Sequence, residues 1–172
     1  GKVLKEITNG HWEVRALHGV DKDGIVYFSG TERSHTGLDI YRIDLSGSDR
    51  RLMSTTTGTH SAQFNPSLTL YIDRWSDIAT PPQIRLHDST GASVRTIANN
   101  PATHLTEYAL PKAEFHQIKN RDGFVMEALM IKPPNFDPTH QYPVYQHVYG
   151  GPHIQRVRNA WSAETLFWQL LA

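Results

Sequence analysis

The sequence contains no cysteine, which excludes disulfide bonds, thiol catalysis and thiolate metal ligands within its 172 residues. It also lacks a run of roughly 18 consecutive apolar residues, so we expect no transmembrane helix. Neither sign of charge is in excess, because lysine plus arginine and aspartate plus glutamate number 17 each. This balance leaves no basic surface of the kind that binds nucleic acid, and we expect no nucleic-acid partner.

Two catalytic patterns are also missing. No Gly-x-Ser-x-Gly occurs, the turn that presents the nucleophilic serine of an α/β-hydrolase. The 10 histidines show neither His-x-x-x-His nor His-x-His spacing, so we expect no metal site and no cofactor. His147 and His153 are therefore interpreted as packing and loop residues. Glu32 and Arg33 are interpreted as a solvated loop.

The first hundred residues are rich in short apolar strands separated by turn residues, and no helical period is sustained there. The turns carry suitable chemistry, as in Asp21-Lys22-Asp23-Gly24 and Asp88-Ser89-Thr90-Gly91. Eight strands are predicted, at residues 12–19, 25–30, 38–44, 51–54, 61–64, 68–75, 83–87 and 94–98.

An internal repeat groups these strands into two sets of four. Ile40-Tyr41-Arg42-Ile43-Asp44 is echoed by Ile84-Arg85-Leu86-His87-Asp88, and a polar glycine turn follows each copy. The spacing from Arg42 to Arg85 is close to the roughly 40–50 residues of a four-stranded β-propeller blade. The repeat favours two propeller blades, whereas strand spacing alone would equally suit a β-sandwich.

The strand rhythm breaks at Asn99-Asn100-Pro101, which we take as a domain boundary. A short helix is predicted over 101–108, with Asn100 as its N-cap. A β-hairpin is predicted from strands 113–119 and 124–131 around an Asp-Gly turn. A third, nearly all-apolar strand is predicted over 142–149, as for a strand covered on both faces. A helix is predicted after Trp161, with Ser162 as N-cap and Glu164 in its first turn.

The predicted strand 142–149 ends in Tyr149-Gly150-Gly151-Pro152. In α/β-hydrolases, the loop after the third strand supplies a donor to the oxyanion that develops during acyl transfer. A phenol carries its proton at neutral pH and can donate such a hydrogen bond. Tyr149 is therefore the candidate oxyanion-hole residue, and Gly150, Gly151 and Pro152 are the residues that would shape its loop.

A resemblance to a known family extends over nearly the whole chain. The sequence resembles the prolyl oligopeptidase family of serine peptidases and, within it, dipeptidyl peptidase IV. The spacing of Gln155, Val157, Asn159 and Trp161 after the glycines supports the narrower match. The stretches that carry the resemblance are Thr8-Asn9-Gly10-His11-Trp12-Glu13-Val14, Lys132-Pro133-Pro134-Asn135-Phe136-Asp137, Gln141-Tyr142-Pro143-Val144 and Val148-Tyr149-Gly150-Gly151-Pro152.

The resemblance implies a mainly β fold in two incomplete parts. Residues 1–99 would be two four-stranded blades from the end of a β-propeller. Residues 100–172 would be the first strands and first helix of an α/β-hydrolase domain. The family's oxyanion tyrosine falls on Tyr149, and its serine, aspartate and histidine would lie beyond Ala172. We therefore expect this chain to be a fragment that is inactive alone.

For the longer parent, the resemblance implies a serine exopeptidase that releases Xaa-Pro or Xaa-Ala dipeptides through an acyl-enzyme. Its partner would be a peptide with a free N-terminus. Export to the periplasm or cell surface and a homodimeric parent are further implications, and the isolated fragment is expected to self-associate. Two alternatives stay open. One is another peptidase of this family, such as an acylaminoacyl peptidase, whose loop usually reads His-Gly-Gly-Pro without a tyrosine. The other is a non-catalytic propeller-type interaction module.

Overall fold

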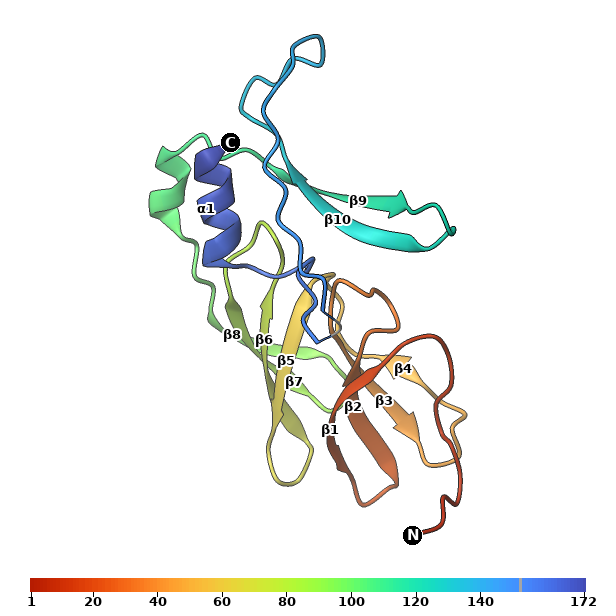
Figure 1. Cartoon of the computed structure of the whole chain (residues 1–172). Helices are drawn as coiled ribbons and strands as arrows, with labels where there is room; N and C mark the ends of the chain where they lie inside the picture. Colours follow the sequence, from red (N-terminus) through yellow and green to blue (C-terminus); the bar gives the residue numbers. More distant parts are fainter. Residues whose placement is uncertain (152) are drawn as a thin grey trace.

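The protein is mainly β, with two four-stranded antiparallel sheets, a two-stranded hairpin and one C-terminal helix (Figure 1). The computed structural model describes residues 1–151 and 153–172. The first sheet has the strand order β1-β2-β3-β4 and the second β5-β6-β7-β8. The elements are β1 (Val14–Val20), β2 (Ile25–Gly30), β3 (Asp39–Asp44), β4 (Arg51–Leu52), β5 (Thr59–Phe64), β6 (Leu70–Ser76), β7 (Gln83–Asp88), β8 (Ser93–Ala98), the 3-10 helix η1 (Thr103–Glu107), β9 (Ala113–Lys119), β10 (Val125–Ile131) and α1 (Ala163–Leu171).

All eight strands predicted in the first hundred residues are present, with their ends shifted by at most two residues. The predicted turn residues act as expected. Asp21 Oδ1 accepts hydrogen bonds from the N–H groups of Asp23 and Ile25 (3.0 and 2.9 Å). Asp88 Oδ1 accepts from the N–H groups of Thr90 and Ala92 in the same way (2.8 and 3.1 Å). Local turn chemistry therefore fixes where these strands reverse.

The first sheet is covered on one face by the N-terminal segment. Side chains alternate along β2 and β3, so that Val26, Phe28, Tyr41 and Ile43 form a buried cluster on that face. Trp12 packs on this cluster, with its ring stacked 6.0 Å from Phe28. The indole N–H donates to the Asn9 carbonyl (3.0 Å), which holds the segment before β1 in place.

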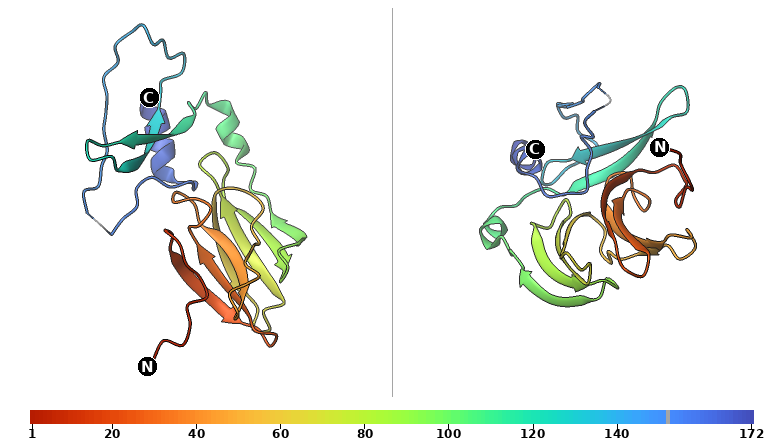
Figure 2. Two further views of the ribbon diagram at one scale, coloured as in Figure 1. Left: turned by 90° about the vertical axis from the view of Figure 1, so that its right-hand side faces the viewer. Right: turned by 90° about the horizontal axis from the view of Figure 1, so that it is seen from below.

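The opposite face of the first sheet packs against the second sheet. A second buried cluster joins Tyr27, Ile40 and Met53 to Tyr71 of β6. Phe64 lies between Tyr27 and Tyr71, with its ring 5.0 and 4.7 Å from theirs. Figure 2 shows the two curved sheets side by side, seen from below. The hydrophobic core therefore joins the two sheets into one body.

A polar junction links the sheets at the end nearest the hairpin. Leu38 N–H donates to the Gly58 carbonyl (3.1 Å), and Leu38 and Thr59 form a parallel bridge. Beside this bridge, the Thr56 carbonyl accepts hydrogen bonds from both Arg33 and His60.

Each of these donors is paired with a buried carboxylate. Arg33 Nε donates to Asp39 at the start of β3 (3.0 Å). His60 Nδ1 lies 2.7 Å from Oδ2 of Asp73 in β6. The interpretation of Arg33 as a solvated loop residue is wrong, because its guanidinium reaches inward to this carboxylate. One backbone carbonyl thus receives a donor from each sheet, and each donor side chain also contacts a buried carboxylate.

The Asp39 carboxylate should matter far more than a surface one. We expect Asp39→Asn to lower the free energy of unfolding by about 3 kcal/mol, because the Arg33 charge loses its buried partner. Asp49→Asn, which breaks the exposed pair with Arg51, is the matched control and should leave the denaturant midpoint unchanged. Urea unfolding of both variants tests this, and equal midpoints would contradict it.

The segment after the second sheet departs from prediction at the start of its helix. The short helix predicted over 101–108 is present as the 3-10 helix η1, but its N-cap is Ala102, which makes no side-chain hydrogen bond, and not Asn100. Asn100 and Ala102 have φ angles of 35° and 45°, so the chain turns through the left-handed region where the helix was expected to begin. An Asn100 N-cap needs extended backbone and cannot form there.

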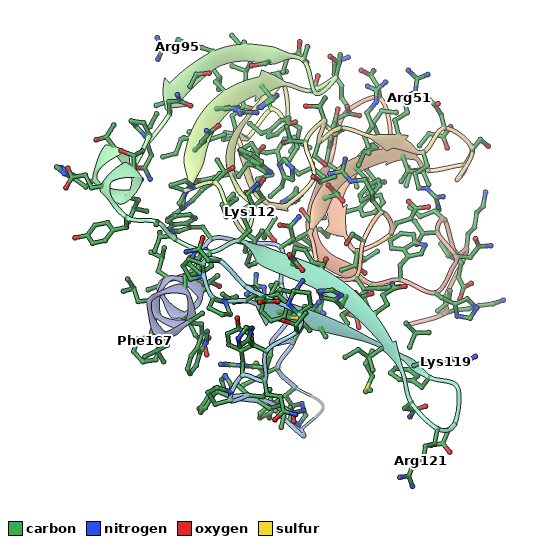
Figure 3. All side chains as sticks on the ribbon, turned by 90° about the horizontal axis from the view of Figure 1, so that it is seen from above. Arg51, Arg95, Lys112, Lys119, Arg121 and Phe167 are labelled. Atoms are coloured by element: carbon green, nitrogen blue, oxygen red, sulfur yellow. The ribbon has the colours of Figure 1, made fainter. Side chains whose placement is uncertain are left out.

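The hairpin and the C-terminal helix agree with prediction. β9 and β10 pair in register from Ala113–Ile131 to Lys119–Val125. In Figure 3, Lys119 and Arg121 lie at the far tip of this hairpin, and Phe167 lies on α1. Ser162 caps α1 by accepting a hydrogen bond from Thr165 N–H (3.0 Å). Within the described part of the chain, no helix is both long and apolar enough to cross a bilayer.

The predicted strand over 142–149 is wrong. These residues have no regular secondary structure, and the side chains of Val144 and Val148 are 89% and 69% exposed. A strand needs a hydrogen-bonded neighbour, and no described strand pairs with this segment. The segment instead runs extended past α1 (Figure 1), where Tyr145 stacks on Trp168. The two-sheet architecture is present as predicted, while its interpretation as propeller blades beside a hydrolase domain stays a prediction.

Three core tyrosines give the fold a pH limit. Burial raises the pKa of all three phenols, those of Tyr27, Tyr41 and Tyr71. The pKa of Tyr41 is raised to about 12. Because the unfolded phenol has a pKa of about 10, the neutral rings stabilise the fold below about pH 10. This stabilisation should be lost as the pH rises through about 12.

We therefore expect alkaline unfolding above about pH 10, with the tyrosinate absorbance of these three rings appearing together with loss of the β signal in circular dichroism. The measurement is a pH titration that follows both signals in one sample. Complete tyrosine ionisation of a chain that keeps its circular dichroism would contradict the expectation.

Candidate functional site

Tyr149 lies in the extended segment between β10 and α1, with its side chain 42% exposed. Within residues 1–151 and 153–172, its hydroxyl forms no hydrogen bond. The ring folds back over Gly151, where a methyl group would lie 2.5 Å from the Tyr149 hydroxyl oxygen. Gly150 has open space around it, and neither glycine adopts left-handed backbone. A side chain at position 151 would therefore displace the Tyr149 ring, while Pro152 lies outside the described residues.

The chain before Tyr149 is attached to α1. The ring of Tyr145 stacks on Trp168, with centroids 5.0 Å apart and planes at 27°. The ring of His147 lies 5.7 Å from the same indole, and its Nδ1 is 3.3 Å from Glu164 Oε1. His147 is thus a packing residue, as predicted, and it also contributes a polar contact to the helix.

The chain after Tyr149 is attached to the sheets. Gln155 Nε2 donates to the His35 carbonyl in the loop between β2 and β3. Asn159 makes three hydrogen bonds with residues of both sheets or their loops. Its N–H donates to the Thr36 carbonyl (2.7 Å), its carbonyl accepts from Thr59 Oγ1 (2.9 Å), and its Oδ1 accepts from Ile78 N–H (3.0 Å).

Glu164 connects the two sides of this loop. Its Oε1 faces Arg156 as well as His147. The two partners flank Tyr149, Gly150 and Gly151, so one carboxylate contacts both ends of the loop 147–156, which is described except for residue 152. From the sequence, Glu164 was expected only in the first turn of the helix, and Asn159 only as part of a motif. The polar side chains of His147, Arg156 and Glu164 were the available signal, but their separation in sequence hid the contact.

The structure gathers little else around Tyr149. Among the described residues, no group of three or more histidine, aspartate or glutamate side chains could hold a metal ion. His153 is exposed and lies in the same loop. The arrangement supplies one proton donor, Tyr149, on a loop anchored at both ends. Such a group can stabilise negative charge on a neighbouring oxygen, and it needs a nucleophile from elsewhere to take part in acyl transfer.

The chain is similar to known proteins in sequence. Residues 1–82 match the family model described as the dipeptidyl peptidase IV (DPP IV) N-terminal region. The chain is 34% identical over 161 residues to an Aspergillus oryzae protein named "Probable dipeptidyl-aminopeptidase B", covering 88% of this chain and 18% of that protein. It is 32% identical over 166 residues to dipeptidyl peptidase 4 of Arthroderma otae, covering 91% of this chain and 21% of that one.

The fold is also similar to a solved structure. The crystal structure of Porphyromonas gingivalis dipeptidyl peptidase 4 superimposes with a TM-score of 0.86 at 33% identity, over 92% of this chain and 23% of that one. The relatives are thus dipeptidyl peptidases. The chain is dipeptidyl peptidase IV-like, and it spans about a fifth of the length of the curated relatives that it matches.

The two glycines make a matched pair of variants. We expect Gly151→Ala to displace the Tyr149 ring, because its methyl group would meet the hydroxyl, while Gly150→Ala should leave the ring in place. Both variants should melt close to the parent, since the tyrosine side chain can swing into solvent. Chemical shifts of the Tyr149 ring protons test this. Equal shifts in the two variants would contradict the contact.

Proposed function

We propose that this chain is part of a serine peptidase that releases N-terminal dipeptides and that Tyr149 donates a hydrogen bond to the oxyanion of its acyl-transfer steps. The observation that carries the proposal is Tyr149 itself, which is 42% exposed and whose hydroxyl has no hydrogen bond among the described residues, on a loop anchored to both α1 and the sheets. The relatives named dipeptidyl peptidases support the reaction class.

The proposal divides the chain into two parts. Residues 1–99 are two blades of a β-propeller, and residues 100–172 are the N-terminal part of an α/β-hydrolase peptidase domain. Support for the blades comes from two sheets of four sequential antiparallel strands that pack side by side through Tyr27, Ile40 and Tyr71. In this assignment the long segment after β10 passes from the hydrolase part to the two blades. There Asn159 forms hydrogen bonds with residues of both blades or their loops.

The chemistry would follow the two-step pattern of serine hydrolases. A serine outside this chain attacks the scissile carbonyl, and the carbonyl oxygen becomes an oxyanion that Tyr149 stabilises by donating its hydroxyl proton in a hydrogen bond. Collapse of this oxyanion breaks the scissile C–N bond, and the amine leaves carrying the proton that the serine gave up. Water then attacks the dipeptide acyl-enzyme through a second oxyanion at the same donor, which releases the dipeptide and returns the proton to the serine. The chain alone lacks a Gly-x-Ser-x-Gly nucleophile and is proposed to be inactive.

The substrate is a peptide with a free N-terminus and Pro or Ala at its second residue. The runner-up, an acylaminoacyl peptidase, would accept a blocked N-terminus instead, and the tyrosine before the paired glycines favours the first reading. Export to the periplasm or cell surface and a homodimeric parent belong to the same proposal. No metal or cofactor enters the proposed steps.

Removing one hydroxyl tests the role of Tyr149. In the full-length protein, Tyr149→Phe should lower kcat about 10²–10³-fold, because one oxyanion donor is lost. KM should change little, since the substrate carbonyl gains this interaction mainly in the transition state. The measurement is steady-state hydrolysis of Ala-Pro and Gly-Pro amides.

Tyr108→Phe, an exposed tyrosine after η1, is the matched control and should behave as wild type. A Tyr149→Phe enzyme with wild-type kcat would remove Tyr149 from the mechanism. Turnover of N-acetylated substrates in place of free dipeptidyl amides would instead favour the acylaminoacyl alternative.

A further inference from the structure

We propose that Glu164 is a positioning residue, which holds the loop 147–156 closed and so fixes the Tyr149 hydroxyl where the oxyanion forms. The inference rests on the proposed function of Tyr149. It concerns a residue on a different element, the first turn of α1.

The geometry of the carboxylate carries the proposal. Glu164 Oε1 lies 3.3 Å from His147 Nδ1, and the same oxygen is paired with the guanidinium of Arg156. His147 precedes Tyr149 by two positions, and Arg156 follows Gly151 by five. A single carboxylate oxygen therefore joins the two ends of the loop. Arg donors and a carboxylate form charge-assisted hydrogen bonds, which are stronger than those between neutral groups.

Little else holds the loop. Within its described residues, no backbone–backbone hydrogen bond joins 147–156 to the rest of the chain. The remaining contacts are the stack of Tyr145 and His147 on Trp168 before the loop and the anchors of Gln155 and Asn159 near its end. Loss of the Glu164 contact would therefore leave Tyr149 with a wider range of positions.

The carboxylate itself stands on a rigid support. Ser162 caps α1, and Trp161 N–H donates to Ser76 Oγ at the end of β6 (3.2 Å). At the other end of the helix, Gln169 Nε2 donates to the Pro111 carbonyl (2.7 Å). A negative charge in the first turn is also favourable to the helix. A group that positions others needs such a fixed base.

The hairpin offers a matched control. Glu114 in β9 faces His116 (3.4 Å) and Lys132 (2.8 Å) with one carboxylate oxygen, as Glu164 faces His147 and Arg156. The two glutamates are equally exposed, at 45% and 46% of the side chain. Exposed ion pairs contribute little to stability, so neither Glu→Ala change should alter the melting temperature much. Only the Glu164→Ala change should alter the position of the Tyr149 side chain.

The test is a double-mutant cycle in the full-length protein with Ala-Pro amide as substrate. We expect Glu164→Ala to lower kcat about tenfold with KM nearly unchanged, because small displacements of a positioned group cost rate. Glu164→Gln keeps an acceptor oxygen and should recover most of kcat, and Glu114→Ala should match wild type. In a Tyr149→Phe background, Glu164→Ala should cause no further loss, since it acts through that hydroxyl.

A second readout does not depend on activity. Chymotrypsin cleavage after Tyr149, followed by mass spectrometry of the 172-residue chain, should be about fivefold faster for Glu164→Ala than for Glu114→Ala, because an opened loop fits a protease better.

The outcomes separate the two proposals. A Glu164→Ala enzyme with the kcat of Glu114→Ala, or the same loss of kcat with and without the Tyr149 hydroxyl, would overturn the positioning role. If Tyr149→Phe leaves kcat unchanged, the proposed function fails. In that case the chymotrypsin experiment still tests whether Glu164 holds the loop. Equal cleavage rates for Glu164→Ala and Glu114→Ala would overturn that claim.

Discussion

The carbonyl of Thr56 is the point on which the arrangement of the two sheets depends. It accepts hydrogen bonds from Arg33 and from His60, and each donor is itself paired with a buried carboxylate, Asp39 in β3 and Asp73 in β6. Buried charges are costly unless they are paired and fully hydrogen-bonded, so this carbonyl can satisfy both donors only when the sheets meet at one distance and angle. The apolar cluster beneath it supplies most of the attraction, and the junction supplies the register.

The candidate site is built outward from that junction. Thr59, which binds Asn159, forms the bridge with Leu38, and Thr36, which also binds Asn159, lies two residues before Leu38. The loop that carries Tyr149 is thereby attached to the sheets through Asn159 and to α1 through Glu164. A proton donor in an otherwise irregular segment gains a defined place because its two ends are attached to rigid elements.

Sequence reasoning succeeded where the determinants are local. The eight strands, the hairpin and the capped helix α1 follow from alternation, turn residues and an N-cap serine, all within a few positions of one another.

Sequence reasoning failed where the determinants of the structure are far apart in the chain. The run 142–149 has the composition of a covered strand but no partner strand, and Arg33 looked solvated because its carboxylate partner was not evident from the loop. The contacts of Asn159 and Glu164 join residues far apart in the chain, which a single sequence does not reveal. Tyr149 was found from its motif, and its role stays a prediction.

Every strand in the two sheets pairs with the strand next to it in the sequence. Such short-range closures cost little chain entropy and form early, whereas Thr59 and Asn159 close a much longer loop. During synthesis from the N-terminus, the sheets and their junction can therefore assemble before residue 159 has left the ribosome. The loop bearing Tyr149 would then dock onto two sheets that are already folded. The order in which the chain is synthesised would therefore also be the order in which this site forms.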